Sequence, residues 1–265
     1  DIWFPQGYNQ KTKYAVLYMH DGQMLFDAKT TWNKQEWRVD EVGQALINQD
    51  KVQPFIVVGV HNGDLNRHAE YFPERPFHGL TPEQQQLQYQ QMRSENVKLF
   101  SKPIYSDRYL KFLVTELKPY IDSHFSVHTD REHTFVMGSS MGGLISMYAI
   151  NEYPEVFGGA ACLSTHWPGN FMTKDNPIPA KFFAYLQQHL PKPAAHKFYF
   201  DYGDQTLDAL YPPLQKQVDA IMQQKNYPAE LWQTHFFAGA EHSENAWAKR
   251  LDIPLTFLLA KKSEH

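Results

Sequence analysis

The chain is poor in cysteine and carries no block of like charge. Its 265 residues include a single cysteine, which excludes an intrachain disulfide. Cys162 lies in the apolar run 159–163, a setting typical of a buried structural thiol rather than a reactive one. The net charge is −4, from 25 basic and 29 acidic residues, and no basic cluster indicates a nucleic-acid partner or an anionic membrane surface.

Long apolar runs are also missing. The uncharged stretch 133–151 is interrupted by glycines, which divide it into a strand and a helix, so we expect no membrane span there. No signal peptide is recognisable, but Ile2 and Trp3 resemble the tail of a strand. We therefore expect N-terminal strands, and with them any export signal, to precede Asp1. The sequence leaves the compartment open (cytoplasmic, or periplasmic or secreted), and it does not determine the oligomeric state.

What the sequence does contain is a regular alternation of apolar strands and amphipathic helices. We predict six strands, at 14–19, 54–60, 135–137, 158–163, 197–202 and 231–237. We predict helices between them, at 32–48, 105–123, 144–152, 180–190, 213–224 and 246–260. This alternation indicates an α/β fold with a mostly parallel central sheet and helices on both faces, in a single domain spanning 1–265.

One segment, 65–103, does not follow this alternation. It is irregular up to Thr81-Pro82, where a threonine cap and a proline in the first turn predict a helix start. We expect a lid-like excursion above the sheet, with a solvated surface helix as the alternative.

The strongest motif is the strand, turn and helix around Ser140. The pattern Gly-x-Ser-x-Gly runs from Gly138 to Gly142, after an apolar strand and before a run of helix formers. The turn requires glycine on both sides, because a Cβ there would clash with the backbone that lifts the serine hydroxyl clear of the sheet. We predict a nucleophile elbow with Ser140 as the nucleophile.

A serine nucleophile needs a histidine base and, in most cases, a carboxylate that orients the histidine. In α/β-hydrolases these follow in the order serine, acid, histidine. His242, in the loop after the last predicted strand, is our candidate base. Asp204 and Asp208 follow the strand before it and are both candidate acids, whereas Asp201 lies inside that strand and is the least favoured.

Acyl transfer also requires donors for the developing oxyanion. We predict the backbone N–H groups of Met141, which follows the nucleophile, and of Gln23, in the loop after the first long strand, where Gly22 allows close backbone approach. His166 and Trp167 follow another strand and are predicted to contact substrate. The histidines show no metal-ligand spacing, so we predict no metal site and no cofactor.

Four segments carry a family resemblance: Tyr-Met-His-Asp-Gly-Gln (18–23), Gly-Ser-Ser-Met-Gly-Gly (138–143), Asp-Tyr-Gly with Leu-Asp (201–208), and Gly-Ala-Glu-His with Ala-Trp (239–247). In this order they resemble the putative-esterase family of α/β-hydrolases, which includes esterase D, feruloyl esterases, mycolyltransferases and enterobactin-esterase relatives. The chain is most similar to the enterobactin-esterase-like branch.

The resemblance implies Ser140 as nucleophile and His242 as base, and its Leu-Asp ending favours Asp208 over Asp204 as the acid of a catalytic triad. Some enterobactin-esterase relatives work with a Ser-His dyad, which leaves the acid open. The segment from Arg67 to Tyr71 is also family-like, and we interpret it as an ion-paired loop brace.

We therefore expect a serine esterase that cleaves small-molecule carboxylic esters. Two alternatives stay open: an acyltransferase that uses the same site, and a binding protein on a hydrolase fold that catalyses nothing.

Overall fold

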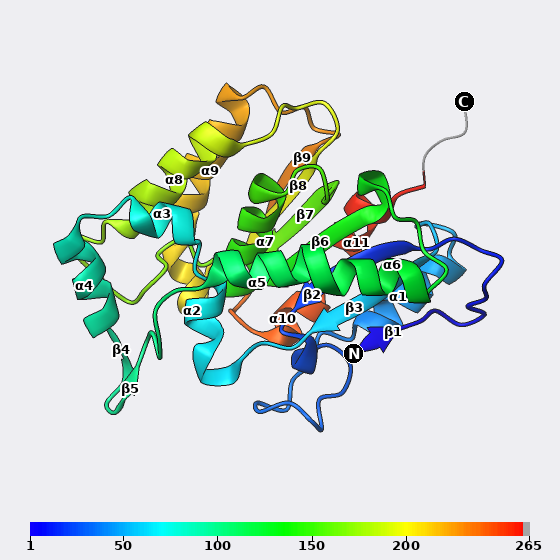
Figure 1. The fold of residues 1–265 in the computed structure, drawn as a ribbon, viewed down its shortest axis with the longest axis horizontal. Helices are drawn as coiled ribbons and strands as arrows, with labels where there is room; N and C mark the ends of the chain where they lie inside the picture. Colours follow the sequence, from blue (N-terminus) through cyan, green and yellow to red (C-terminus); the bar gives the residue numbers. More distant parts are fainter. Residues whose placement is uncertain (262–265) are drawn as a thin grey trace.

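The computed structural model describes residues 1–261. Its centre is a seven-stranded sheet in the order β1-β3-β2-β6-β7-β8-β9 (Figure 1). The strands are β1 Ile2–Trp3, β2 Ala15–His20, β3 Phe55–Val60, β6 Thr134–Ser139, β7 Gly159–Leu163, β8 Lys197–Tyr202 and β9 Trp232–Phe236. All neighbours pair in parallel except β1, which is antiparallel to β3. The predicted mostly parallel sheet is confirmed.

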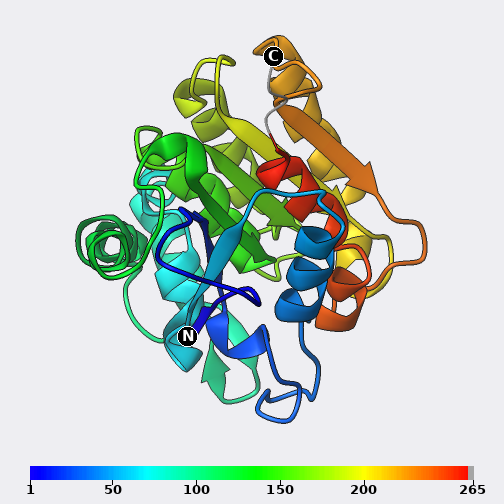
Figure 2. The same ribbon diagram turned by 90° about the vertical axis from the view of Figure 1, so that its right-hand side faces the viewer.

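Helices cover both faces of this sheet, as predicted, and Figure 2 shows α1 and α11 on one side with α5 on the other. The larger helices are α1 Val39–Asn48, α5 Ser106–Phe112, α6 Lys118–His124, α7 Met141–Glu152, α8 Ile178–His189, α9 Pro212–Gln224 and α11 Asp252–Leu259. Within the described residues, no helix is both long and apolar enough to cross a bilayer.

Two hydrophobic cores follow from the alternation of side chains along the strands. On β2, Val16 and Tyr18 join the core beneath α5, α7, α8 and α9. Their neighbours Leu17 and Met19 join the opposite core, beneath α1 and α11. All six residues of β2 are therefore buried, which explains why this strand is continuously apolar rather than alternating.

Two predicted helices differ from the observed ones. The first starts at Val39 rather than near residue 32, because Arg38 adopts a left-handed conformation (φ 55°) that ends the preceding loop. The last one splits into α10, Glu244–Ala248, and α11. Pro254 in the first turn of α11 has no backbone N–H with which to continue a helix from the preceding turn.

The helix predicted at 105–123 is a single rod, but its middle is wider than an α-helix. Leu113–Leu117 forms a π-helical turn between α5 and α6. Pro119 lies just beyond this turn and cannot donate a hydrogen bond back to Thr115, so the local helical ladder is interrupted there.

The excursion at 65–103 contains three short helices and a hairpin: α2 Arg67–Tyr71, α3 Glu74–His78, α4 Pro82–Gln90, β4 Met92–Ser94 and β5 Val97–Lys98. The predicted helix start is confirmed, since Thr81 and Gln84 form a reciprocal capping box with distances of 3.2 and 3.0 Å. Gln88 of α4 is buried against Asn170, with 2.7 Å between their amide groups. Lid-like movement of this segment stays a prediction.

Candidate active site

Ser140 lies at the junction of β6 and α7 in a conformation that side chains rarely adopt (φ 59°, ψ −121°). A Cβ on Gly138 would lie 2.7 Å from backbone atoms of Gly142, so only glycine fits at that position. A Cβ on Gly142 would meet the Asp21 carboxylate at 3.2 Å, a less severe contact. The sequence thus folds locally into the predicted strand, sharp turn and helix.

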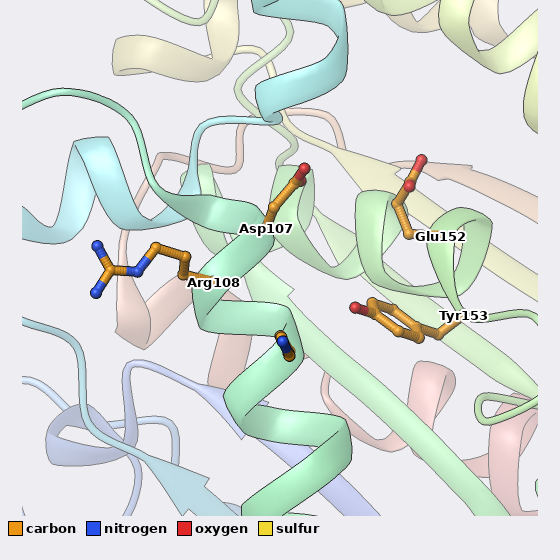
Figure 3. A pocket seen from close by; sticks show the side chains of 5 residues that line it. Asp107, Arg108, Glu152 and Tyr153 are labelled. Atoms are coloured by element: carbon orange, nitrogen blue, oxygen red, sulfur yellow. The ribbon is translucent and has the colours of Figure 1, made fainter.

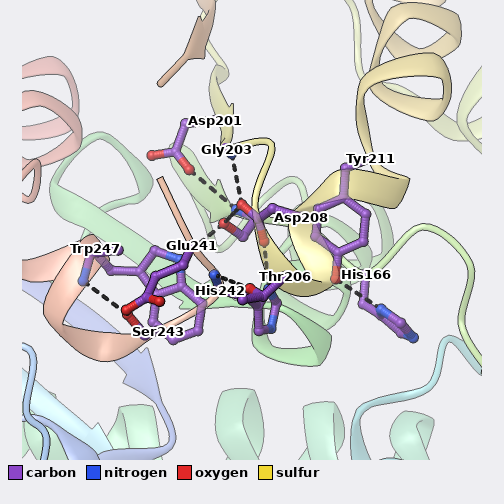
Figure 4. Close-up of polar contacts among 12 residues, drawn as sticks. His166, Asp201, Gly203, Thr206, Asp208, Tyr211, Glu241, His242, Ser243 and Trp247 are labelled. Carbon is purple, nitrogen blue, oxygen red and sulfur yellow. Dashed lines mark hydrogen bonds and ion pairs between the residues drawn. The ribbon is translucent and has the colours of Figure 1, made fainter. Parts of the chain in front are cut away.

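His242 lies in the loop after β9, and its ring faces Asp208 (Figure 4). His242 Nδ1 is 2.6 Å from Asp208 Oδ1. The other carboxylate oxygen of Asp208 accepts hydrogen bonds from the Gly203 N–H at 2.7 Å and the Ser164 hydroxyl at 2.6 Å. Asp204, the other predicted acid, instead accepts from the Gly239 N–H at 2.8 Å. The structure therefore pairs His242 with Asp208.

This environment keeps Asp208 ionised. Burial by itself would raise the pKa of this carboxyl, but the hydrogen bonds and charge of His242, with the Ser164 and Gly203 donors, outweigh burial. The net effect is a pKa below the usual range for aspartate. Asp208 was harder to identify than Ser140 because it belongs to a short 3₁₀ turn, Thr206–Leu210, rather than to a recognisable motif.

Both the backbone and the ring of His242 are held in place. Its backbone N–H donates to Thr206 Oγ1 at 2.9 Å. Two aromatic rings meet it edge to face, Trp247 with a centroid distance of 5.0 Å and Tyr211 with 5.8 Å. The plane of the imidazole is thereby fixed relative to Asp208.

Ser140 and His242 line the same cavity, which has a volume of about 1040 Å³. It opens at the carboxyl ends of the parallel strands, where functional groups of open α/β sheets collect. Its other lining residues are Arg93 of β4, Ser139 of β6, and a set from loops and short helices: Asp21, Gln23, Met24, Thr30, Thr31, Trp32, Asn33, Gln35, Trp37, Asn62, Asp64, Leu65, Arg67, Thr206, Glu241, Ser243, Glu244 and Trp247.

The Ser140 side chain lies close to the hydroxyl of Tyr211. Tyr211, in turn, is 2.9 Å from Nδ1 of His166. The other ring nitrogen of His166 is 3.2 Å from the carbonyl oxygen of Asn170, which only accepts, so that nitrogen carries the proton. Burial, reinforced by the nearby His242, lowers the pKa of His166 to about 3. His166 is therefore a neutral, buried partner of Tyr211.

Trp167 does not reach the cavity. Its side chain is fully buried, packs against Phe183 and Phe200, and donates its indole N–H to Gln215 at 2.8 Å. The prediction that Trp167 contacts substrate is therefore corrected to a role in the core. Trp32 lines the cavity instead, with 84% of its surface exposed.

The two predicted oxyanion donors lie at helix starts. Met141 is the first residue of α7, and Gln23 is in the 3₁₀ turn Gly22–Met24. The first N–H groups of a helix have no acceptor within it, so they are available to a ligand. Gly22 is required by packing, since a Cβ on it would lie 2.4 Å from the Gly59 carbonyl carbon of β3.

A buried ion pair supports the Gln23 loop. Asp21 has a left-handed conformation (φ 57°), and its two oxygens accept from Arg67 at 2.6 and 2.7 Å. Asn62 donates to the same carboxylate at 2.6 Å. Burial would raise the pKa of Asp21, but Arg67 and Asn62 reverse this and lower it. The predicted loop brace is confirmed, with Asp21 as the partner of Arg67.

A second, smaller hollow of about 240 Å³ lies between α5 and the C-terminal end of α7, lined by Asp107, Arg108, Lys111, Glu152 and Tyr153 (Figure 3). Ser140 is at the opposite end of α7, so this hollow is separate from the site.

Among the described residues, one group has metal-ligand types within reach of one another: His128, Asp130 and His133. It precedes β6, whereas Ser140 follows that strand, so the two lie at opposite ends of it. The two imidazoles are stacked with an interplanar angle of 18°, so their in-plane lone pairs lie in two nearly parallel planes rather than converging on one point.

Comparison with known proteins identifies a family that the chain matches. A family model described as "Putative esterase" matches residues 1–258. The chain is similar to the uncharacterized protein YbbA of Bacillus subtilis (strain 168), with 25% identity over 171 residues. That match covers 64% of this chain and 57% of YbbA, so the chain spans less than two thirds of this relative.

Solved structures share the fold. A ferulic acid esterase superposes with a TM-score of 0.65 at 17% identity, covering 97% of this chain and 90% of the other. The enterochelin esterase of Shigella flexneri superposes with a TM-score of 0.67 at 16% identity, covering 97% and 53%. The α/β-hydrolase fold and the resemblance inferred from the sequence are both confirmed.

Proposed function

The chain belongs to the family described as Putative esterase, and from that premise we propose that it hydrolyses carboxylic esters of small molecules through an acyl-enzyme at Ser140. The observation that carries the proposal is that His242, whose Nδ1 lies 2.6 Å from Asp208, lines the same cavity as Ser140. A serine in a strained backbone conformation and an oriented histidine that face the same cavity are typical of a catalytic site, and packing of the core requires neither.

In the proposed reaction the Ser140 oxygen attacks the ester carbonyl carbon while His242 Nε2 accepts the serine proton. The carbonyl oxygen becomes an oxyanion, held by the N–H groups of Met141 and Gln23. When the ester C–O bond breaks, His242 returns the proton to the departing alcohol. Water then attacks the acyl-serine, giving its proton to His242, and the carboxylic acid leaves as Ser140 recovers its hydrogen.

Each residue's role follows from its contacts. With the Nδ1 proton of His242 directed at Asp208, the Nε2 lone pair is free to act as base. For this transfer the Ser140 hydroxyl must point at His242 Nε2 rather than at the nearby Tyr211 hydroxyl. Each oxyanion donor contributes about 3 kcal/mol of transition-state stabilisation in enzymes of this kind.

We further propose that the ester carries an aromatic group. Three tryptophans, Trp32, Trp37 and Trp247, line a cavity large enough for such a group. Two structural neighbours are, by their names, a ferulic acid esterase and an enterochelin esterase. Aryl-acid esters are therefore the first substrates to test, against simple acetyl esters.

The test is active-site labelling with a fluorophosphonate, with the adduct located by mass spectrometry. We expect an adduct at Ser140 that is absent in Ser140→Ala and His242→Ala but present in Ser106→Ala, which removes a buried hydroxyl elsewhere. Turnover of an ester panel, with and without added alcohols, separates hydrolysis from acyl transfer. A folded protein that forms no adduct and cleaves no ester would refute the proposal.

A further inference from the structure

Behind Asp208, on the side away from His242, lies a buried polar cluster. It consists of Ser164, Asp201, Trp247 and Arg250, none of them more than 3% exposed. We propose that Ser164 is a positioning residue for the reaction: it fixes Asp208 opposite His242 and connects that carboxylate to the buried Arg250. This inference rests on the proposed function.

The hydrogen-bond directions around Ser164 allow one arrangement. Its hydroxyl oxygen is 2.6 Å from Asp208 Oδ2, 2.9 Å from Trp247 Nε1 and 3.0 Å from Arg250 Nη2. An indole and a guanidinium can only donate, so together they occupy both lone pairs of the hydroxyl. The single hydroxyl hydrogen must then point at Asp208. The hydroxyl rotor, free in most serines, is fixed here by its partners.

Arg250 is itself held in place. It donates to both oxygens of Asp201, at 2.8 Å from Nη2 and 3.0 Å from Nε. Tyr199 donates to the same carboxylate at 3.1 Å, and so does the Ser164 backbone N–H at 3.2 Å. Ser164 is therefore bound through both its backbone and its hydroxyl to one buried network.

The backbone of Ser164 also indicates a position set by its surroundings. It has a positive φ of 42°, a conformation that costs a non-glycine residue free energy and persists only where neighbouring contacts impose it. The residue directly follows β7, and the register that pairs Leu163 with Asp201 places it at that network.

The network changes how Asp208 interacts with His242. Asp208 shares its negative charge among three donors, and the one from Ser164 is strengthened because Arg250 polarises the same hydroxyl. Without the Ser164 donor, more of that charge would face His242, and the imidazole would hold its proton more tightly. Other polar groups near His242 stay the same in that comparison: Glu241, Tyr211 and His166, the last two of which also feel the charge of Arg67.

The experiment follows the titration of His242 by NMR in protein labelled with ¹³C at histidine Cε1, with the signal assigned by its loss in His242→Gln. We expect Ser164→Ala to raise the midpoint by about half a pH unit, since a hydrogen bond to a charged group is lost. We expect kcat/KM for an aryl ester to fall about tenfold, its acidic limb moving to higher pH and KM changing little. Ser106→Ala, a matched loss of a buried hydroxyl, should change neither the His242 midpoint nor kcat/KM.

An unchanged His242 midpoint in folded Ser164→Ala would overturn the inference, whatever happens to the rate. If Ser164→Ala does not fold, Ser164→Gly removes the same hydroxyl and relieves the positive φ, and its titration is decided on the same criterion. The titration needs no turnover. Absence of esterase activity in the unaltered protein would therefore refute the proposed function while leaving the midpoint measurement to decide the role of Ser164.

Discussion

Replacing Asp208 with asparagine tests the site most directly, because the structure dictates how the new side chain must lie. Gly203 and Ser164 both donate to Oδ2, at 2.7 and 2.6 Å, so the asparagine oxygen has to occupy that position. Its NH₂ group then takes the place of Oδ1, 2.6 Å from His242 Nδ1. Since this group donates, His242 must present a bare Nδ1 and carry its proton on Nε2.

In that tautomer the imidazole has no lone pair directed at Ser140. The corresponding change in a serine protease lowers kcat about 10⁴-fold, equivalent to about 5.5 kcal/mol of transition-state stabilisation. Stability should change with pH as well. The pKa of Asp208 is lowered in the folded state, so its contribution is present above the unfolded pKa of about 3.9 and is lost as pH falls through the folded pKa. The variant should therefore match the parent in stability only in strong acid.

The assay compares kcat for an aryl ester and the rate of fluorophosphonate labelling in Asp208→Asn and Asp204→Asn. In the Asp204→Asn control the new amide oxygen can still accept from the Gly239 N–H, so this variant should stay within about twofold of the parent. Asp208→Asn retaining rates within tenfold of the parent would refute the tautomer argument and support a Ser-His dyad. If Asp204→Asn lost as much activity as Asp208→Asn, the result would contradict the assignment of Asp208 as the acid.

Three further changes probe other parts of the site. Gly138→Ala places a Cβ 2.7 Å from backbone atoms of Gly142, so urea unfolding should show a loss of about 2 kcal/mol or more together with loss of labelling. Trp32→Ala removes an exposed side chain from the cavity wall, and KM for aryl esters should rise about tenfold while kcat and Tm stay constant. Tyr211→Phe removes the hydroxyl that lies close to Ser140, so labelling should be no slower; a tenfold loss would show that Tyr211 takes part in the reaction.

The parts of this molecule that could be predicted from sequence are those whose signals are local. The apolar strand, the glycine spacing and the helix around Ser140 all lie within one short segment, and the structure reproduces them. The order in which polar residues follow the strands likewise identified His242 as the candidate base. For the acid, sequence left two choices four residues apart, because only the three-dimensional turn decides which carboxylate faces His242.

What could not be predicted depends on register between distant strands. Ser164 meets Asp201 because β7 pairs with β8 so that Leu163 lies opposite Asp201, and no pattern in either segment encodes that offset. The place of Tyr211 in the site could not be predicted either, because it is defined by contacts with His166 and Ser140, which are distant in sequence. Trp167 shows the converse: an aromatic after a strand end can point into the core as readily as into a cavity.

The order of the strands along the chain also determines when the candidate site can form during synthesis. The elbow strand β6 lies in the middle of the sheet, and the loop bearing His242 follows β9, the edge strand that is last in the chain. At ribosomal speeds of about 5–20 residues per second, Ser140 emerges several seconds before His242. In the proposed mechanism Ser140 would therefore have no base opposite it throughout that interval. A growing chain that ends before His242 would form no acyl-enzyme.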